Sequence, residues 1–103
     1  MDDGSASSGG DDLAAHGEQL ALRRKRVRFR SCHRGMKELD VLLGRFVDRH
    51  LDQLTPVQLD RYESLIESPD PDLYRWILGR GAPPAIHDTD VMALLRDVRY
   101  SPQ

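Results

Sequence analysis

Cysteine, aromatic residues and long apolar runs are all scarce in this chain of 103 residues. Its single cysteine, Cys32, excludes an internal disulfide framework and fits a reducing compartment. No window approaches the ~20 apolar residues that a membrane-spanning helix requires. The first residues have neither the apolar core of a signal peptide nor the basic composition of a mitochondrial presequence. We therefore expect a soluble, cytoplasmic protein that does not enter a membrane.

Clusters of metal-ligating and catalytic residues are missing from the sequence as well. The four histidines are scattered, and none lies at metal-ligand spacing from Cys32 or from a carboxylate. His33 is adjacent to Cys32, but neighbouring helix positions point about 100° apart, which disfavours a nucleophile–base pair. Cys32 is more simply a small core residue, and His50 a packing residue beside an apolar stripe. We expect no catalytic residue and no metal site.

Two further patterns that could carry chemistry have simpler structural explanations. Asp70 and Asp72 flank Pro71, and acidic residues in the first turn of a helix stabilise its dipole. Residues 79–81, Gly-Arg-Gly, lack the preceding strand and the following helix of a phosphate-binding loop, so we interpret them as a helix stop. The sequence therefore indicates a protein that is not an enzyme.

Charge is distributed unevenly along the chain. Residues 1–19 contain five acidic residues and no Lys or Arg, so they contribute −5 to a net charge of −2, and the remainder carries +3. They also contain almost no large apolar side chains, so they cannot bury enough surface to offset the entropy lost on ordering. We predict a disordered acidic tail over residues 1–19 and one small domain over residues 20–100.

Helical periodicity dominates from Leu20 onward, and strand-like alternation is nearly absent. Short connections between amphipathic segments predict an all-α fold, a small five-helix bundle. The first helix is expected from Leu20 to Arg34, closed by Gly35 in the left-handed conformation, with Leu22, Val27, Phe29 and Cys32 loosely on one face. The second helix is expected to carry an apolar stripe from Met36 through Leu43 to Leu54, and the third to be capped by Thr55. The fourth is expected to start at Asp70–Pro71 with Trp76 inward, and the fifth to be capped by Asp88 or Thr89.

The size of this bundle limits what it can contain. A domain of ~80 ordered residues buries roughly 60–65% of its unfolded surface, which allows one modest core. Leu43 and Trp76 are expected in that core. No room remains for a deep cofactor cavity, so we expect no cofactor-binding residue in this chain.

The predicted first helix is strongly basic. Residues 20–38 contain one acidic residue, Glu38, and eight basic ones. The basic residues are Arg23, Arg24, Lys25, Arg26, Arg28, Arg30, Arg34 and Lys37. Such a surface can dock a protein, neutralise the phosphates of a nucleic acid, or be simply a solvated arginine-rich face. Stacking aromatics are few and no helix has a clear recognition sequence, so we favour protein docking. A small basic helical nucleic-acid-binding or regulatory protein is the alternative.

Two sequence blocks resemble those of a known family. Residues 31–40 read SCHRGMKELD, with the pattern Arg34-Gly35-x-x-Glu38, and residues 69–77 read PDPDLYRWI. In so short a chain, these blocks and their separation are similar to the SdhE-type family of FAD assembly factors, with the RGxxE motif. The similarity extends over roughly residues 23–78.

The resemblance implies a function as well as a fold. Members are five-helix bundles that bind the flavoprotein subunit of succinate dehydrogenase and promote covalent attachment of FAD to it. The FAD then belongs to the client, with fumarate reductase as a second candidate client. Carried onto this chain, the partner-binding residues are Arg34, Gly35, Met36, Lys37 and Glu38.

The chemistry of the motif suggests how it would recognise a partner. Arg34 and Glu38 are expected to face solvent, with Glu38 forming a charge-assisted hydrogen bond to the client and Arg34 contacting a client carboxylate or carbonyl. Gly35 has two explanations. A side chain there would strain the turn, or it would obstruct the close approach of a partner.

Overall fold

The computed structural model describes the backbone of residues 9–98 and the side chains of residues 17–98. Within this range the chain is all-α and contains no strand, which confirms the predicted five-helix fold. No helix in residues 9–98 is long and apolar enough to span a bilayer. The helices are α1 (Gly9–Cys32), α2 (Lys37–His50), α3 (Pro56–Leu65), α4 (Asp70–Ile77) and α5 (Asp90–Val98), with short 3-10 turns η2 (Leu51–Gln53) and η3 (Ala85–His87).

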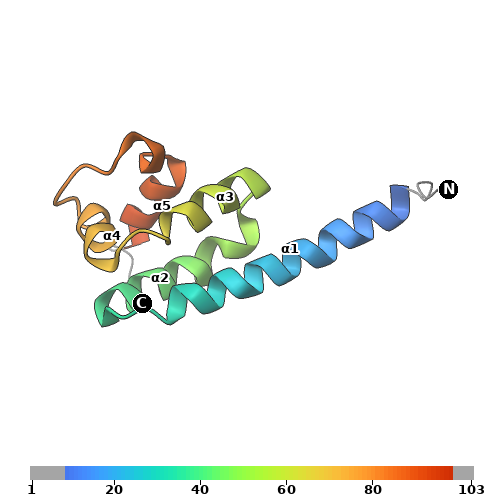
Figure 1. Cartoon of the computed structure of the whole chain (residues 1–103), viewed down its shortest axis with the longest axis horizontal. Helices are drawn as coiled ribbons and strands as arrows, with labels where there is room; N and C mark the ends of the chain where they lie inside the picture. Colours follow the sequence, from blue (N-terminus) through green and yellow to red (C-terminus); the bar gives the residue numbers. More distant parts are fainter. Residues whose placement is uncertain (1–8, 99–103) are drawn as a thin grey trace.

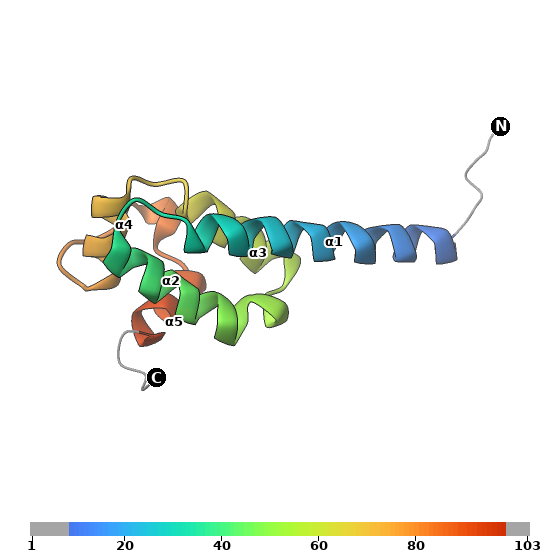
Figure 2. The same ribbon diagram turned by 90° about the horizontal axis from the view of Figure 1, so that it is seen from below.

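The helices pack around α2. Helix α1 runs antiparallel to α2 along one side of it, and α5 packs on α2 and also contacts α3 and α4 (Figure 1). The second view shows the same arrangement, with the N-terminal half of α1 projecting beyond the bundle (Figure 2). The residues that join α1 to α2 therefore lie at the end of the molecule opposite this projection.

Helix α1 begins at Gly9 rather than at Leu20. The predicted tail rests on the small apolar surface that residues 1–19 could bury and does not take helix propensity into account. Residues 13–21 read LAAHGEQLA, and most of these residue types have high intrinsic helix propensity. A helix that projects from the bundle needs propensity more than burial. Residues 1–8 of the expected tail and residues 99–100 of the expected domain lie outside the described part of the chain.

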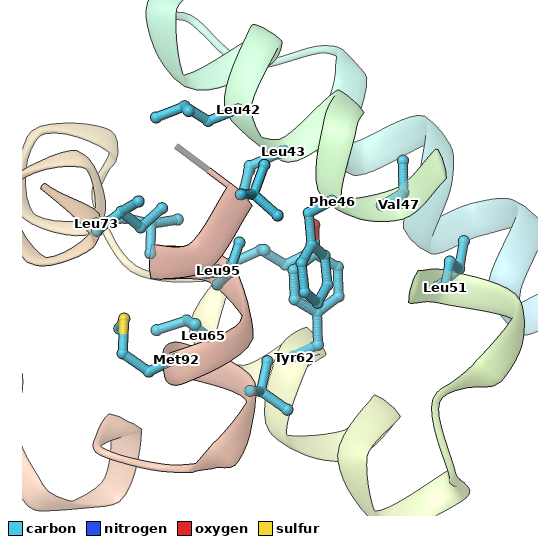
Figure 3. Packing of buried hydrophobic residues seen from close by; sticks show 14 of the residues in the cluster. Leu42, Leu43, Phe46, Val47, Leu51, Tyr62, Leu65, Leu73, Met92 and Leu95 are labelled. Atoms are coloured by element: carbon cyan, nitrogen blue, oxygen red, sulfur yellow. The ribbon is translucent and has the colours of Figure 1, made fainter. Parts of the chain in front are cut away.

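The core forms where α2, α3 and α5 meet. Phe46 and Tyr62 are fully buried, and their ring centroids lie 4.8 Å apart (Figure 3). The Tyr62 hydroxyl lies 2.6 Å from Ser31 Oγ, and Ser31 donates to the carbonyl of Val27 at 2.8 Å. The hydrogen bond between these two buried hydroxyl groups links α3 to α1. Leu43 and Trp76 are buried, as predicted.

Local sequence signals fix the starts and stops of α3 and α4. Thr55 Oγ1 accepts from the Gln58 amide at 3.1 Å, and Gln58 Oε1 accepts from the Thr55 amide at 3.0 Å, which confirms the capping box. Helix α4 starts at Asp70 and ends before Gly79, which has a φ of 74°. The Gly79 and Arg80 amides donate back to carbonyls of the last turn, as in a Schellman motif.

The apolar residues of α1 do not share one face, contrary to the prediction. Val27 is fully buried, but Leu22 and Phe29 are 56% and 63% exposed. Cys32 is exposed rather than a core residue, and the neighbouring Ser31 is buried instead. At 100° per residue, Val27 and Ser31 point towards the bundle while Leu22 and Phe29 lie on the opposite side. The apolar pattern of α1 is loose because its apolar residues lie on two opposite faces of the helix.

Candidate functional site

The segment that joins α1 to α2 is held by one carboxylate from α4. Asp70 Oδ1 accepts from Arg34 Nε at 3.0 Å and from Arg34 Nη2 at 2.6 Å. Asp70 Oδ2 accepts from the backbone amides of Gly35 and Met36 at 3.1 and 3.2 Å. Both carboxylate oxygens are thus used by residues of the RGxxE motif. We call residues 33–36 together with the first turn of α2 the motif loop.

A second carboxylate holds the same loop from the α2 side. Asp40 Oδ1 accepts from the Arg34 amide at 2.6 Å. The guanidinium of Arg34 also reaches the carbonyl of Ser68, at 3.4 Å. Because the loop amides would otherwise lack helical partners, these acceptors satisfy them and fix the start of α2. The motif loop is therefore pre-organised in the free chain.

Arg34 lies inside this arrangement and does not face solvent. Its side chain is only 10% exposed, and its Nη2 is paired with Asp70. The expectation that Arg34 is solvent-facing is therefore wrong. The Nε and Nη2 groups of Arg34 donate to Asp70 and to the Ser68 carbonyl, so most of its N–H donors are used within the protein. Its role in this structure is to position the loop.

Gly35 does not adopt the left-handed conformation that was expected to end the first helix. Among the described glycines, positive φ occurs at Gly79 and not at Gly35. A Cβ placed on Gly35 would lie 3.9 Å from Asp70 Oδ2, which is an ordinary van der Waals contact. The explanation by backbone strain is therefore wrong. Gly35 is exposed, and the explanation by close approach of a partner stays a prediction.

The side chains that the motif presents outward are those of Lys37 and Glu38. Both are exposed in the first turn of α2, and neither has a hydrogen bond or ion pair within the described chain. The solvent-facing position expected for Glu38 is thus confirmed. Met36 is half-buried and packs against the core. The structure therefore divides the five predicted residues into two supporting side chains, Arg34 and Met36, and an outward set of Gly35, Lys37 and Glu38.

Sequence reasoning missed three residues of this site. Asp70 was assigned only to the start of α4, and Asp40 was given no role. The pairing of Asp70 with Arg34 spans 36 positions, and no local pattern predicts such a contact. Val41 lies three residues after Glu38 and is 46% exposed, so it extends the outward surface by one apolar side chain.

Most arginines of α1 that were candidates for phosphate binding are paired within the bundle. An arginine whose charge is neutralised by a neighbouring carboxylate contributes little to nucleic-acid affinity. The nucleic-acid alternative is therefore not favoured. The pairs are Arg23 with Asp60 and Glu63, Arg28 with Asp48, and Arg30 with Glu67.

The described side chains contain no group of three or more His, Cys, Asp or Glu residues that could hold a metal ion. His33 stacks on Phe29, with ring centroids 3.9 Å apart, and its Nδ1 lies 2.8 Å from the Phe29 carbonyl. His50 packs beside Phe46, with ring centroids 5.2 Å apart. These two histidines therefore have packing roles.

Comparison with known proteins assigns the chain to a family. Residues 25–99 match the family described as "Flavinator of succinate dehydrogenase". The "FAD assembly factor SdhE" of Acetobacter pasteurianus is 42% identical over 83 residues, which cover 78% of this chain and 76% of that protein. The "Succinate dehydrogenase assembly factor 2, mitochondrial" of Dictyostelium discoideum is 40% identical over 73 residues, or 71% of this chain.

The coverage of the relatives differs. The matched segment spans 52% of the Dictyostelium protein. The "FAD assembly factor SdhE" of Vibrio cholerae is 45% identical over 51 residues, which cover 50% of this chain and 59% of that protein. The family match includes the motif loop and the α4 segment that holds it. The chain therefore belongs to the family of flavinators of succinate dehydrogenase.

Proposed function

We propose that this chain is an assembly factor that binds the flavoprotein subunit of succinate dehydrogenase and promotes covalent attachment of FAD to it. One observation carries the proposal. The outward side chains of the RGxxE motif stand on a loop that Asp70 and Asp40 hold in place, although none of them supports the bundle. An outward carboxylate and ammonium on a fixed backbone fit recognition of another protein. The family membership and the names of the relatives support this choice.

The proposed mechanism does not use a catalytic side chain of this chain. FAD belongs to the client, and the new bond joins the flavin to a residue of the client. This chain binds preferentially to the client conformation in which these two groups can react, and so it raises the population of that conformation. Glu38 contributes a charge-assisted hydrogen bond to the client, and Gly35 permits the close approach. Fumarate reductase is a second candidate client.

The test is flavin fluorescence of the denatured client subunit after gel electrophoresis. The client is produced without this chain, with the wild-type chain, and with its Glu38→Ala variant. Fluorescence should require the wild-type chain and fall strongly with Glu38→Ala. The variant should stay folded, because Glu38 contributes only ~0.3–1 kcal/mol through the helix dipole.

A matched control removes another exposed carboxylate. Asp52 in η2 is exposed and has no hydrogen bond or ion pair to the rest of the described chain, so Asp52→Ala should leave client fluorescence at the wild-type level. Equal fluorescence with and without the wild-type chain would contradict the proposal. Unfolding of Glu38→Ala, measured by circular dichroism, would instead show that Glu38 supports the fold.

The compartment that we propose is the cytoplasm. The argument is the one made from the sequence, namely that a chain with one cysteine fits a reducing environment. The structure adds that Cys32 is an exposed free thiol. Fractionation of cells that express the chain at its natural level would test the proposal.

A further inference from the structure

The outward face of α1 carries large apolar side chains that the bundle does not use. Leu22 and Phe29 are 56% and 63% exposed, and with Lys25, Arg26 and Arg30 they line a shallow hollow of about 350 Å³. We call Leu22, Lys25, Arg26, Phe29 and His33 the outer stripe. Its residues recur at intervals of three and four, so they share one side of the helix. The outer stripe is a continuous surface about 16 Å long.

The outer stripe does not result from imperfect packing of α1. At 100° per residue, Phe29 and His33 lie close to the direction of Leu22, whereas Val27 and Ser31 lie on the opposite side of the helix. Val27 and Ser31 are fully buried. Helix α1 thus contacts α2 with one face while a second face with apolar residues points to solvent. Large exposed apolar side chains at helical spacing are typical of a docking surface.

The basic residues of α1 separate in the same way. Arg23, Arg28 and Arg30 are paired with carboxylates of the bundle. Lys25 and Arg26 are exposed and contact no acceptor among the described residues. The outer stripe therefore combines two apolar side chains with two uncompensated positive charges. A complementary partner supplies an apolar side chain flanked by carboxylates.

We propose that the outer stripe is a second docking surface for the flavoprotein client and binds an acidic, amphipathic segment of it. This inference rests on the proposed function. An apolar side chain of the segment packs between Leu22 and Phe29, and carboxylates pair with Lys25 and Arg26. His33 stacks on Phe29 at one end of the stripe and immediately precedes Arg34. The stripe therefore leads directly into the motif loop, so one partner can contact both.

Other occupants fit the chemistry less well. A second copy of the chain would bring Lys25 and Arg26 against the same residues of its own outer stripe, and like charges in contact oppose association. Nucleic acid would neutralise the two charges but would leave Leu22 without an apolar contact. An acidic protein segment matches both properties of the stripe.

The experiment measures the affinity of the full chain for the purified flavoprotein subunit by isothermal titration calorimetry. Two double variants remove the two properties separately, Leu22→Ala with Phe29→Ala, and Lys25→Glu with Arg26→Glu. Each should weaken binding about tenfold or more, because exposed aromatic and basic residues are frequent hot spots. Melting temperatures should stay at the wild-type value, because these side chains lie outside the core.

Matched controls come from the connection between α4 and α5. Ile86 is 71% exposed, and Arg80 is exposed with no side-chain hydrogen bond or ion pair within the described chain. Ile86→Ala with Arg80→Glu should bind within about twofold of wild type. Glu38→Ala tests the proposed function in the same assay. If Glu38→Ala weakens binding and both stripe variants bind like wild type, the outer stripe is not a client surface and the proposed function stands.

Three other results would also decide the matter. No affinity of the wild-type chain for the subunit would overturn the proposed function and, with it, this assignment. Stripe variants that keep client affinity but lose binding to phosphatidylserine vesicles would assign the stripe to a lipid surface. Stripe variants that keep client affinity but lose self-association in sedimentation equilibrium would assign it to a second copy. Each of the last two results overturns the inference.

Discussion

At the scale of single residues, the RGxxE motif contains side chains of two kinds. Arg34 is turned inward and bound by Asp70, while Glu38 is exposed and bound by nothing in the described chain. Substitutions of the two residues should therefore have different consequences. Loss of Arg34 or of its partner should affect stability and function together, whereas loss of Glu38 should affect function alone.

Asp70→Asn tests the supporting half of the site. Asparagine removes the charge that Arg34 pairs with and cannot accept all four donors with the same strength. The pair is partly buried, so we expect the free energy of unfolding to fall by about 1–3 kcal/mol, measured in urea. Asp72→Asn is the control, because Asp72 in the same helix turn is more exposed and, among the described residues, pairs with Arg75. Equal losses for the two variants would contradict a special role of Asp70.

Gly35→Ala tests the outward half. The position has no positive φ and a Cβ meets only an ordinary contact, so alanine should leave the melting temperature equal or slightly higher. A gain of ~0.4–1 kcal/mol is typical when glycine can be replaced without strain. Client flavin fluorescence should nevertheless fall, because the methyl group occupies the approach path.

The matched control for this variant is Gly44→Ala. A Cβ on Gly44, within α2, meets nothing within 4 Å, so alanine should stabilise the helix and leave client fluorescence unchanged. A destabilised Gly35→Ala variant would restore the explanation by backbone conformation.

At the scale of elements, helix ends were predictable and helix faces only partly so. The capping box of α3 and the glycine stop of α4 involve residues within a few positions of one another, and such signals can be read locally. The face of α1 was not predictable, because Val27 shares its inward side with Ser31 and arginine side chains and is not part of a continuous apolar stripe. The Arg34–Asp70 contact depends on how α4 packs near the α1–α2 loop, which no sequence spacing specifies.

The cap of α3 allows a prediction at this scale. Thr55→Ala removes the acceptor of the Gln58 amide, so the free energy of unfolding should fall by about 1 kcal/mol in a urea titration. Thr55→Ser keeps the hydroxyl and should retain most of the stability. Client flavin fluorescence should be unchanged for both variants at temperatures well below unfolding. A Thr55→Ser variant as unstable as Thr55→Ala would show that the methyl group matters more than the cap.

At the scale of the whole molecule, one phenol links the core to α1 and makes stability depend on pH. Burial raises the pKa of Tyr62 well above its usual value near 10, despite the opposing hydrogen bond with Ser31. The folded state therefore keeps the phenol protonated where the unfolded state would ionise it. The resulting stabilisation is fully present below about pH 10 and declines as the pH rises further.

Tyr62→Phe separates this contribution from the others. The variant should lose about 1 kcal/mol at pH 7, because the hydrogen bond with Ser31 is lost. Between pH 9 and about pH 11, its stability should fall less steeply than that of the wild type in urea titrations. Parallel curves for the two proteins would mean that another group controls alkaline unfolding. Tyr74→Phe is the control, since Tyr74 is only half-buried.

The projecting half of α1 has a consequence for the time course of amide hydrogen exchange. The molecule measures 55 × 29 × 22 Å, and its long dimension follows α1 past the last contact with the bundle. The backbone of the projecting N-terminal half of α1 extends beyond the bundle, so its hydrogen bonds should open locally and its amides should exchange fast while those of α2 exchange slowly. A client that covers the projection would slow only the fast set. Comparing the exchange rates of the projecting amides with and without the client would therefore show how far along α1 the client extends, and the amides of α2 would serve as the internal reference.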